Sequence, residues 1–492
     1  MADFNLLVPP QGVPPFIEVT TPPDPSTQQL WDVTAHKAFA FFWNETSPIT
    51  GLTRDRARNL LRGGCELYDV ASIASTGYML SALAIGVERS WIDRSAAAAR
   101  ALTTLRFVSE QLPHHHGFFP HFVDIHTGRR VWKSEFSSID TALLSVGALA
   151  AGQYFGGEIA QLAEALYAGI DWRWMQGRRG RAPTAVMLKM GWKPETGFSK
   201  FRWQHYDEAS LLYLSALGGA PQNSLHGSLW DQWGQGEALL DGLACEQGEA
   251  LLDGLACEQG KVLLDGLACE QGKVLLDGFA CGQGEVLLEG FACGQGETLL
   301  EGFAIPGRPG PLFWAQMTPA YYSLQGLRDG SGRDWWKLWA DTHRAHHAYC
   351  ARNPQRYPPH REPLWGISAC DRPPSRPGRP VRYRAQRPVD GANDGTIAPT
   401  AALASLTFLP EIADRTLHDL FTCYEGAAWG RYGFANAINP IQGWFDTDVI
   451  GIDLGMMLLA IENHRSGLIW RLTASHPATR KALTAAGFHN AG

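Results

Sequence analysis

The sequence predicts an all-α protein built from helical hairpins. Apolar residues recur at helical spacing from Leu30 onward, alternating β-strand patterns are scarce, and aromatic- and Gly-rich loops separate the helical segments. Successive helices joined by such loops are typical of helix-on-helix architectures. The 492 residues could form several small domains or one large closed one, and length alone does not decide between them.

The predicted helices fall into two groups, one on each side of a tandem repeat. Residues 1–29 are rich in proline and are expected to form an N-terminal arm. Helical periodicity in the first half covers residues 30–43, 69–87, 94–112, 132–155, 159–175 and 205–218. It returns in the second half at residues 332–351, 398–421 and 449–465.

The repeat consists of six copies of a twelve-residue motif, GEALLDGLACEQ and its variants, between residues 236 and 304. As one continuous helix, each copy would rotate the apolar face by roughly 120°, so no apolar stripe would form. Two glycines per copy also oppose a helix, whereas Leu-Leu-Asp-Gly-Leu-Ala-Cys fits a strand, a turn and a second strand. The copies could stack as a solenoid. Their near-identity favours an expanded loop insertion without a catalytic role.

Composition excludes several classes of partner. The net charge is -7 and no polybasic run is present, so nucleic acid is not expected to bind. No stretch of 18 apolar residues and no signal-peptide pattern occurs, so we expect a soluble, cytoplasmic protein without a membrane segment. Five of the nine cysteines lie in the repeat, which favours free thiols over a disulfide framework. The 18 tryptophans suit an aromatic core or a cleft that stacks ring faces.

Polar clusters lie where the predicted helices begin. In a closed ring of hairpins these helix starts would meet at one end, bringing together acids and tryptophans that are distant in sequence. A pair of carboxylates with aromatic faces is what glycoside hydrolysis requires. Neither a G-x-S-x-G nucleophile elbow nor a phosphate-binding loop is present. The clusters contain Arg54, Asp55, Arg56, His121, Asp124, Glu135, Asp140, Trp203, Tyr206, Asp207, Glu208, Trp365, Asp371, Asp394, Trp444, Asp446 and Asp448.

Many segments resemble the bacterial glucoamylase-like family, which includes endo-β-1,2-glucanases and a domain of cyclic β-1,2-glucan synthases. The resemblance runs in order from about residue 30 to 488 and is interrupted only by the repeat. It implies an (α/α)₆ barrel made of residues 30–235 and 305–488, with the insertion at 236–304, and an inverting hydrolase or glycan-remodelling activity. The segments are AFFWNETSPITGLTRDR, SIASTGYMLSALAIGVERSWIDR, FFPHFVDIHTGRR, SEFSSIDTALL, DWRWM, MGWKPETGF, DGTIAPTAALASLTFLPE, WGRYGFANAINP and GIDLGMMLLAIENHRSGLIWR.

The resemblance assigns roles to three carboxylates. Glu208, ahead of the helix in HYDEASLLYLSAL, matches the position of the general acid; the alternative is an acid favoured by the helix dipole. Asp140 and Glu135 are the candidates for the base that activates water. Asp140 could instead take part only in capping the helix after Ser137. Glu135 could instead pair with Arg129 or Arg130.

Further residues are candidates for binding substrate, although each has a structural alternative. The tryptophans could belong to the core, His121 could bond a nearby carbonyl, and Arg54 could pair with Asp55. The histidine groups 114–116 and 343–347 lack further ligands at suitable spacing, so neither a metal nor another cofactor is expected. The candidates are Arg54, Asp55, His121, Asp124, Trp203, Tyr206, Gln316, Trp365, Asp371, Asp394, Trp444 and Asp446.

Two departures from the family pattern bear on the substrate. Pro319, Ser323 and Gln325 replace the histidine, aspartate and arginine that the family carries after Leu-Phe, and residues 372–388 replace a Gly- and Tyr-rich loop with a basic, Pro-rich one. We expect a hydrolase of a β-glucan, with the β-1,2 linkage favoured by the resemblance. A non-catalytic glycan-binding scaffold and a glucan transglycosylase are the alternatives.

Overall fold

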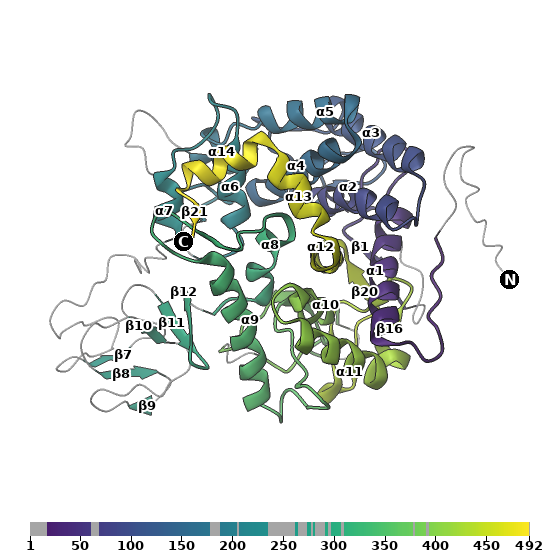
Figure 1. Ribbon diagram of the computed structural model, residues 1–492, viewed down its shortest axis with the longest axis vertical. Helices are drawn as coiled ribbons and strands as arrows, with labels where there is room; N and C mark the ends of the chain where they lie inside the picture. The colour runs from purple at the N-terminus through teal and green to yellow at the C-terminus, as the bar shows by residue number, and fades with distance from the viewer. Residues whose placement is uncertain are drawn as a thin grey trace.

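The computed structural model describes most of the chain outside the repeat. The described residues are 17–60, 68–177, 187–203, 206–234, 261–263, 273–276, 279–280, 291–293, 297–306, 309–376, 379–389 and 393–491. In this part of the chain fourteen α-helices, connected by short strands and loops, carry the architecture (Figure 1). The all-α class predicted from periodicity is therefore confirmed.

Six helices form an inner layer and are buried on nearly every side. Helix α2 packs against α4 and α12, α4 packs against α6, and α8 packs against α6 and α12, which also contacts α10. Glycines permit the closest approach, since a side chain at Gly147 would overlap the backbone of Gly77. The inner helices are α2 (Ile73–Glu88), α4 (Ser138–Phe155), α6 (Ser210–Gly218), α8 (Met317–Tyr321), α10 (Pro399–Ala404) and α12 (Gly451–Ser466).

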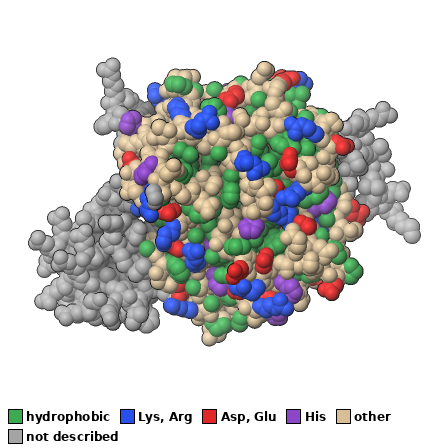
Figure 2. Space-filling model, in the orientation of Figure 1, with side chains coloured by type: hydrophobic (Ala, Val, Ile, Leu, Met, Phe, Trp, Pro, Cys, Tyr) green, Lys and Arg blue, Asp and Glu red, His purple; other side chains and the backbone are tan. Residues whose placement is uncertain are grey.

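The remaining helices lie outside this layer, and most expose one face. For example, α1 packs against α2, α11 and α12, and α5 packs against α3 and α4. Figure 2 shows acidic and basic side chains interspersed over the described part of one face. The outer helices are α1 (Thr27–Asn44), α3 (Arg94–Glu110), α5 (Gly157–Ala168), α7 (Ser228–Gly234), α9 (Trp335–Arg352), α11 (Pro410–Ala428), α13 (Leu468–Ser475) and α14 (Pro477–Ala485).

Local sequence signals fix several helix ends. Ser26 forms a capping box with Gln29 at the start of α1, and Ser72 and Ser137 cap α2 and α4. Gly467 adopts a left-handed conformation (φ 65°) at the end of α12, which only glycine adopts without steric cost. At Gly467 the chain turns from the inner helix α12 into the outer helix α13.

Short strands precede three inner helices and place their starts around a common region. Strand β2 (Val70–Ser72) leads into α2, β4 (Phe136–Ser137) into α4, and β20 (Asp448–Ile450) into α12. The pairs are β1 (Arg56–Arg58) with β20, β2 with β3 (Phe122–Asp124), and β14 (Ala369–Arg372) with β15 (Arg382–Ala385), all antiparallel. Strand β5 (Gly191–Lys193) lies between β4 and β6 (Gly197–Phe198). Such short strands are below the length at which alternation is detectable.

Three further short pairs lie in the second half of the chain. They are β13 (Leu327–Arg328) with β21 (His489–Asn490), β16 (Trp429–Gly430) with β17 (Gly433–Phe434), and β18 (Ile438–Asn439) with β19 (Trp444–Phe445).

The last copy of the repeat forms the strand, turn and strand that its sequence predicts. Strand β11 (Glu297–Leu300) pairs with β12 (Phe303–Pro306) through a two-residue turn in which Glu301 and Gly302 have φ of 53° and 83°. Positive φ at both central residues is typical of a two-residue hairpin turn. Leu300 and Ile305 are fully buried, and Glu301 pairs with Arg352 of α9 at 2.6 Å. This copy is therefore packed onto the helical body.

The earlier copies are described only in short strands. Strand β7 (Lys261–Leu263) pairs in parallel with β8 (Lys273–Leu276), so that equivalent residues of successive copies lie side by side. Strand β9 (Phe279–Ala280) pairs antiparallel with β8, and β10 (Phe291–Cys293) with β11. Most of the repeat lies outside the described residues, so its predicted role as an insertion stays a prediction.

The described helices also bear on the expectation that no segment crosses a membrane. Among them, none is both long enough and apolar enough to span a bilayer.

Candidate active site

A cavity of about 1060 Å³ opens where the inner helices begin. Its walls come from the segments around β1 to β6, the start of α6, the hairpin β14–β15 and the start of α12. Residues from many parts of the chain therefore meet at one site, as a ring of hairpins predicts. Seven of the candidates line it: Asp55, His121, Glu135, Asp140, Trp203, Glu208 and Asp371.

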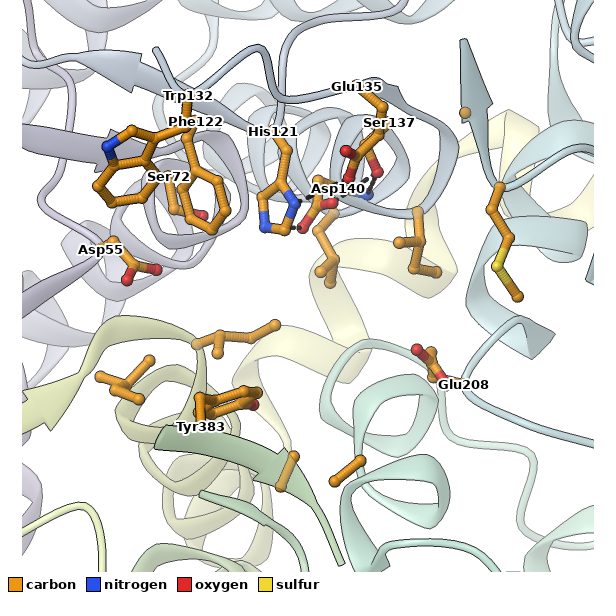
Figure 3. Close-up of a pocket in the computed structure, with 18 of the residues that line it drawn as sticks. Asp55, Ser72, His121, Phe122, Trp132, Glu135, Ser137, Asp140, Glu208 and Tyr383 are labelled. Carbon is orange, nitrogen blue, oxygen red and sulfur yellow. Dashed lines mark hydrogen bonds and ion pairs between the residues drawn. The ribbon is translucent and has the colours of Figure 1, made fainter. Parts of the chain in front are cut away.

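His121 lies between two of the candidate carboxylates (Figure 3). Its Nδ1 donates to Oε1 of Glu135 at 3.1 Å, and its Nε2 lies 3.6 Å from Oδ1 of Asp140. Burial lowers the pKa of His121, but the charges of Asp140, Glu135 and Asp55 outweigh this effect and raise it to about 9. The hydrogen bond from His121 lowers the pKa of Glu135 to about 2. At neutral pH the two form an imidazolium–carboxylate pair.

Asp140 lies at the capped start of α4, and its carboxylate also faces the cavity. The hydroxyl of Ser137 accepts the backbone N–H of Asp140 at 3.3 Å, which caps α4, and donates to the Asp140 carboxylate at 2.5 Å. The serine alone supplies the capping oxygen, which leaves the carboxylate of Asp140 facing the cavity and His121. Position at the first turn of α4 holds this carboxylate in place.

Glu208 approaches the cavity from the segment just before α6, apart from the His121 group (Figure 3). Burial, aided by the negative charge of Asp140, raises the pKa of Glu208 to about 7. Its neighbour Asp207 is also buried, and burial together with the charge of Glu208 raises the pKa of Asp207 well above its usual value. Glu208 is therefore a carboxyl group that carries its proton at mildly acidic pH.

The opposite wall holds a network of acids around one arginine. Arg56 lies 2.9 Å from Asp371 and 3.7 Å from both Asp55 and Asp448. Burial raises the pKa of Asp55 in spite of Arg56 and His121. Burial also raises the pKa of Asp453, to about 8, and the charges of Asp55 and Asp371 add to the shift. Arg56 thus balances only part of the negative charge.

The other candidates lie outside the residues that line the cavity. Asp124 closes the turn to Thr127, Tyr206 is buried among Trp233 and Trp335, and Trp365 is fully buried. Trp444 lies on β19 outside the cavity wall. The rest are held by polar partners: Arg54 by Glu45, Gln316 by the carbonyl of Ala401, Asp394 by Arg372, and Asp446 by the backbone N–H of Thr447.

Two pairings considered from the sequence are wrong. Arg54 pairs with Glu45 at 2.9 Å and not with Asp55, whose side chain lines the cavity. Glu135 pairs with His121 and lies 3.9 Å from Lys193, whereas Arg130 pairs with Glu195 across the neighbouring loop. In both cases the partner comes from a segment that sequence proximity does not identify.

The histidine groups do not form a metal site in the described part of the chain. His343 and His346 are buried in the core, where burial lowers their pKa values to about 4 and about 3. His347 lies 2.6 Å from Glu362. No group of three or more potential metal ligands occurs among the described residues.

Several residues that line the cavity were not among the candidates. They include Phe122, Trp132, Lys193 and Tyr383. Tyr383 lies on β15 within the basic segment that replaces the family loop, so this departure does fall at the cavity. Proximity of Phe122 and Trp132 to His121 and Glu135 in sequence could have suggested them, but nothing in their own pattern distinguishes them from core aromatics.

The second departure lies in α8. Met317 of this helix lines the cavity, whereas the carbonyl of Pro319 accepts the indole N–H of Trp470 at 2.7 Å. Ser323 and Gln325 follow the helix and lie outside the cavity wall. The replaced residues therefore do not line the cavity.

Comparison with known proteins finds one matching family and a similar curated protein. Residues 292–477 match the Glycoamylase family, described as "Putative glucoamylase". The exo beta-1,2-glucooligosaccharide sophorohydrolase (non-reducing end) of Parabacteroides distasonis is 24% identical over 474 residues, which cover 93% of this chain and 57% of that protein. Over residues 292–477 the chain is therefore similar to the glycoamylase-like family, which its motifs also resemble. It spans little more than half the length of this relative.

Solved structures share the fold. The endo-beta-1,2-glucanase of Chitinophaga pinensis, in complex with sophorotriose and glucose, superposes with a TM-score of 0.70 at 21% identity, over 95% of this chain and 99% of that one. The beta-1,2-glucanase of Parabacteroides distasonis gives a TM-score of 0.73 at 22% identity, over 94% of this chain and 60% of that one. The helical architecture is therefore that of these proteins.

Proposed function

We propose that the chain is a glycoside hydrolase that cleaves a β-glucan, most specifically a β-1,2-glucan, with inversion at the anomeric carbon. The observation that carries this proposal is one cavity that contains Glu208, with a raised pKa, and separately Asp140 and Glu135 held by a charged His121. Two carboxyl groups in different protonation states are the requirement for this reaction. The β-1,2 linkage is favoured because the relatives carry it in their names.

Glu208 acts as the general acid. Its pKa of about 7 keeps the carboxyl protonated at mildly acidic pH, and the proton passes to the glycosidic oxygen as the bond to the leaving sugar breaks. Burial is the main cause of the raised pKa, so the surroundings of the carboxyl group keep it protonated for its role as the acid.

Asp140 acts as the base, directly or through a chain of waters. Glu135 is the weaker candidate because a pKa of about 2 makes a carboxylate a poor proton acceptor. Glu135 instead holds His121, whose charged ring keeps the Asp140 carboxylate oriented toward the cavity. In inverting enzymes the two carboxyl groups stand about 6.5–9.5 Å apart, which leaves room for the attacking water.

The fold that supports this site is an (α/α)₆ barrel. Helices α2, α4, α6, α8, α10 and α12 are its inner ring, and the outer helices complete the hairpins. Residues 30–235 and 305–488 supply the two parts of the barrel, residues 1–29 form an arm, and residues 236–304 are an insertion. The starts of the inner helices then form the rim around the cavity.

The test is release of reducing sugar from soluble β-1,2-, β-1,3-, mixed β-1,3/1,4- and α-1,4-glucans. Cleavage of the β-1,2-glucan should fall about 10²–10⁴-fold in Glu208→Gln. The exposed Glu425→Gln variant on α11 is the matched control and should keep full activity.

Three results would contradict the proposal. Activity that survives Glu208→Gln would remove the acid from Glu208. Binding of the glucan without any product would favour a non-catalytic glycan-binding protein. Products longer than the starting chains would identify a transglycosylase.

A further inference from the structure

Trp132 lies at the wall of the cavity, and most of its indole side chain is exposed to solvent. Its side chain is 70% exposed, and it lines the cavity on the loop between β3 and β4. Trp132 and Lys133 both have positive φ, 53° and 49°, a backbone conformation that residues other than glycine rarely adopt. Strained backbone of this kind is often found where a structure presents a side chain to a ligand.

A column of rings connects Trp132 with the catalytic group. The indole contacts the ring of Phe122 edge-on, with centroids 5.2 Å apart. Phe122 in turn stacks on His121, with centroids 3.7 Å apart and planes 16° from parallel. His121 is held in place by Glu135 and Asp140, and it supports the ring of Phe122, which in turn supports the indole of Trp132. The free surface of the indole is left for another molecule.

Tyr383 provides a second exposed ring on the opposite wall. It lies on β15, its side chain is 51% exposed, and it lines the same cavity. Figure 3 shows Trp132 and Phe122 on one wall, Tyr383 on the other, and Glu208 at the far side of His121 and Asp140. The two exposed rings thus flank the part of the cavity that lies away from the general acid.

We propose that Trp132 and Tyr383 form an outer sugar subsite, in which a glucose unit of the chain that is not the one being cleaved packs against the indole face. This inference rests on the proposed hydrolase function. Tryptophan presents a large, rigid apolar surface with little loss of conformational freedom, which suits the apolar face of a pyranose ring.

With this subsite the enzyme distinguishes long glucan chains from short oligosaccharides. A glucan long enough to reach from Glu208 past His121 to Trp132 gains the contact, whereas a short oligosaccharide bound at the acid does not. Since the contact exists both before and during bond cleavage, it lowers KM for long chains and leaves kcat unchanged.

The experiment measures kcat and KM on long β-1,2-glucan and on short oligosaccharides of the same linkage. Trp132→Ala should raise KM for the long glucan about tenfold, leave KM for the shortest cleaved oligosaccharide unchanged, and preserve kcat. Trp132→Tyr should restore most of the loss. Trp132→Asn should behave as the alanine variant does, because asparagine tolerates the left-handed backbone and removes only the ring.

Phe201→Ala is the matched control. Phe201 is 71% exposed and is not among the cavity-lining residues, so its removal should change neither parameter. Calorimetric binding of the long glucan to the Glu208→Gln protein, with and without Trp132→Ala, gives a second readout that does not depend on turnover.

Equal KM values for wild type and Trp132→Ala on long glucan, with equal calorimetric affinity, would overturn the inference while the hydrolase proposal stands. A loss in kcat of equal size on long and short substrates would also overturn it, because that pattern indicates damage to His121 through Phe122. Failure of the wild type to cleave any β-glucan would instead contradict the hydrolase proposal.

Discussion

At the scale of single residues, environment gives chemically similar carboxyl groups different properties. Glu135 shares a hydrogen bond with charged His121, and its pKa falls to about 2. For Glu208 no cation among the described residues opposes the effect of burial, and its pKa rises to about 7. Burial and one imidazole produce this difference. It separates a carboxylate that stays charged from a carboxyl group that can hold a proton near neutral pH.

The raised pKa of Glu208 predicts the pH dependence of cleavage. Because the acid must carry its proton, kcat/KM should fall tenfold per pH unit as pH rises above about 7. On the acid side, the His121–Glu135 pair persists until pH falls toward 2. Rate measurements between pH 3 and 9 test this expectation. An alkaline limb that is unchanged in Glu208→Gln would show that another group donates the proton.

The sequence predicts some of these residues for reasons that can be stated. Acids that precede long apolar segments, such as Glu208 and Asp140, lie at helix starts, and helix starts line the cavity. Trp365 fails as a cavity residue because a tryptophan in an apolar context looks the same in a core and in a cleft. The sequence did not distinguish Trp132 from a core aromatic, because its exposed position goes with two left-handed residues in a turn.

At the scale of elements, the inner helices are buried on nearly every side, so residue size limits how closely they approach one another. Gly147 of α4 lies against Gly77 of α2, and a Cβ on Gly147 would lie 2.0 Å from the carbonyl oxygen of Gly77. This contact is between two backbones, which cannot yield as a flexible side chain can. The sequence shows the small residues but not which of them meet.

We expect Gly147→Ala to destabilise the protein by about 1–3 kcal/mol, because α2 and α4 would have to separate. This loss outweighs the gain of about 1 kcal/mol in helix propensity. Gly426→Ala in α11 is the control, since no atom lies within 4 Å of its added methyl group, and it should not destabilise. Urea unfolding of both variants measures the difference. Equal free energies of unfolding would show that the inner helices tolerate separation.

At the scale of the whole molecule, residues 297–306 of the repeat are attached to the helical body. Leu300 and Ile305 are buried, and Glu301 pairs with Arg352 of α9. Sequence periodicity predicted this hairpin but could not reveal its packing, because the apolar residues are the same in every copy.

Replacing residues 236–296 with a twelve-residue Gly/Ser linker should therefore leave kcat/KM unchanged within about twofold. Shortening a loop fivefold should stabilise the fold by about 1–2 kcal/mol. A longer deletion that also removes β11 and β12 should destabilise the protein, because it uncovers the surface that Leu300 and Ile305 bury. Activity assays and thermal unfolding measure both effects. Loss of activity in the shorter deletion would assign the repeat a role in catalysis.

The first helix packs against elements near the other end of the chain. The indole of Trp31 in α1 donates to Asp414 in α11 at 2.7 Å, Lys37 donates to the carbonyl of Gly430 at 2.9 Å, and strand β1 pairs with β20. During synthesis, a ribosome adding about 5–20 residues per second needs roughly 20–80 seconds to travel from the end of α1 to the end of α12. Until α12 is made, the side of α1 that carries Phe41 lacks its contact with Gly451, the first residue of α12. Because Ile450 and Ile452 line the cavity, the cavity is complete only when translation is nearly finished.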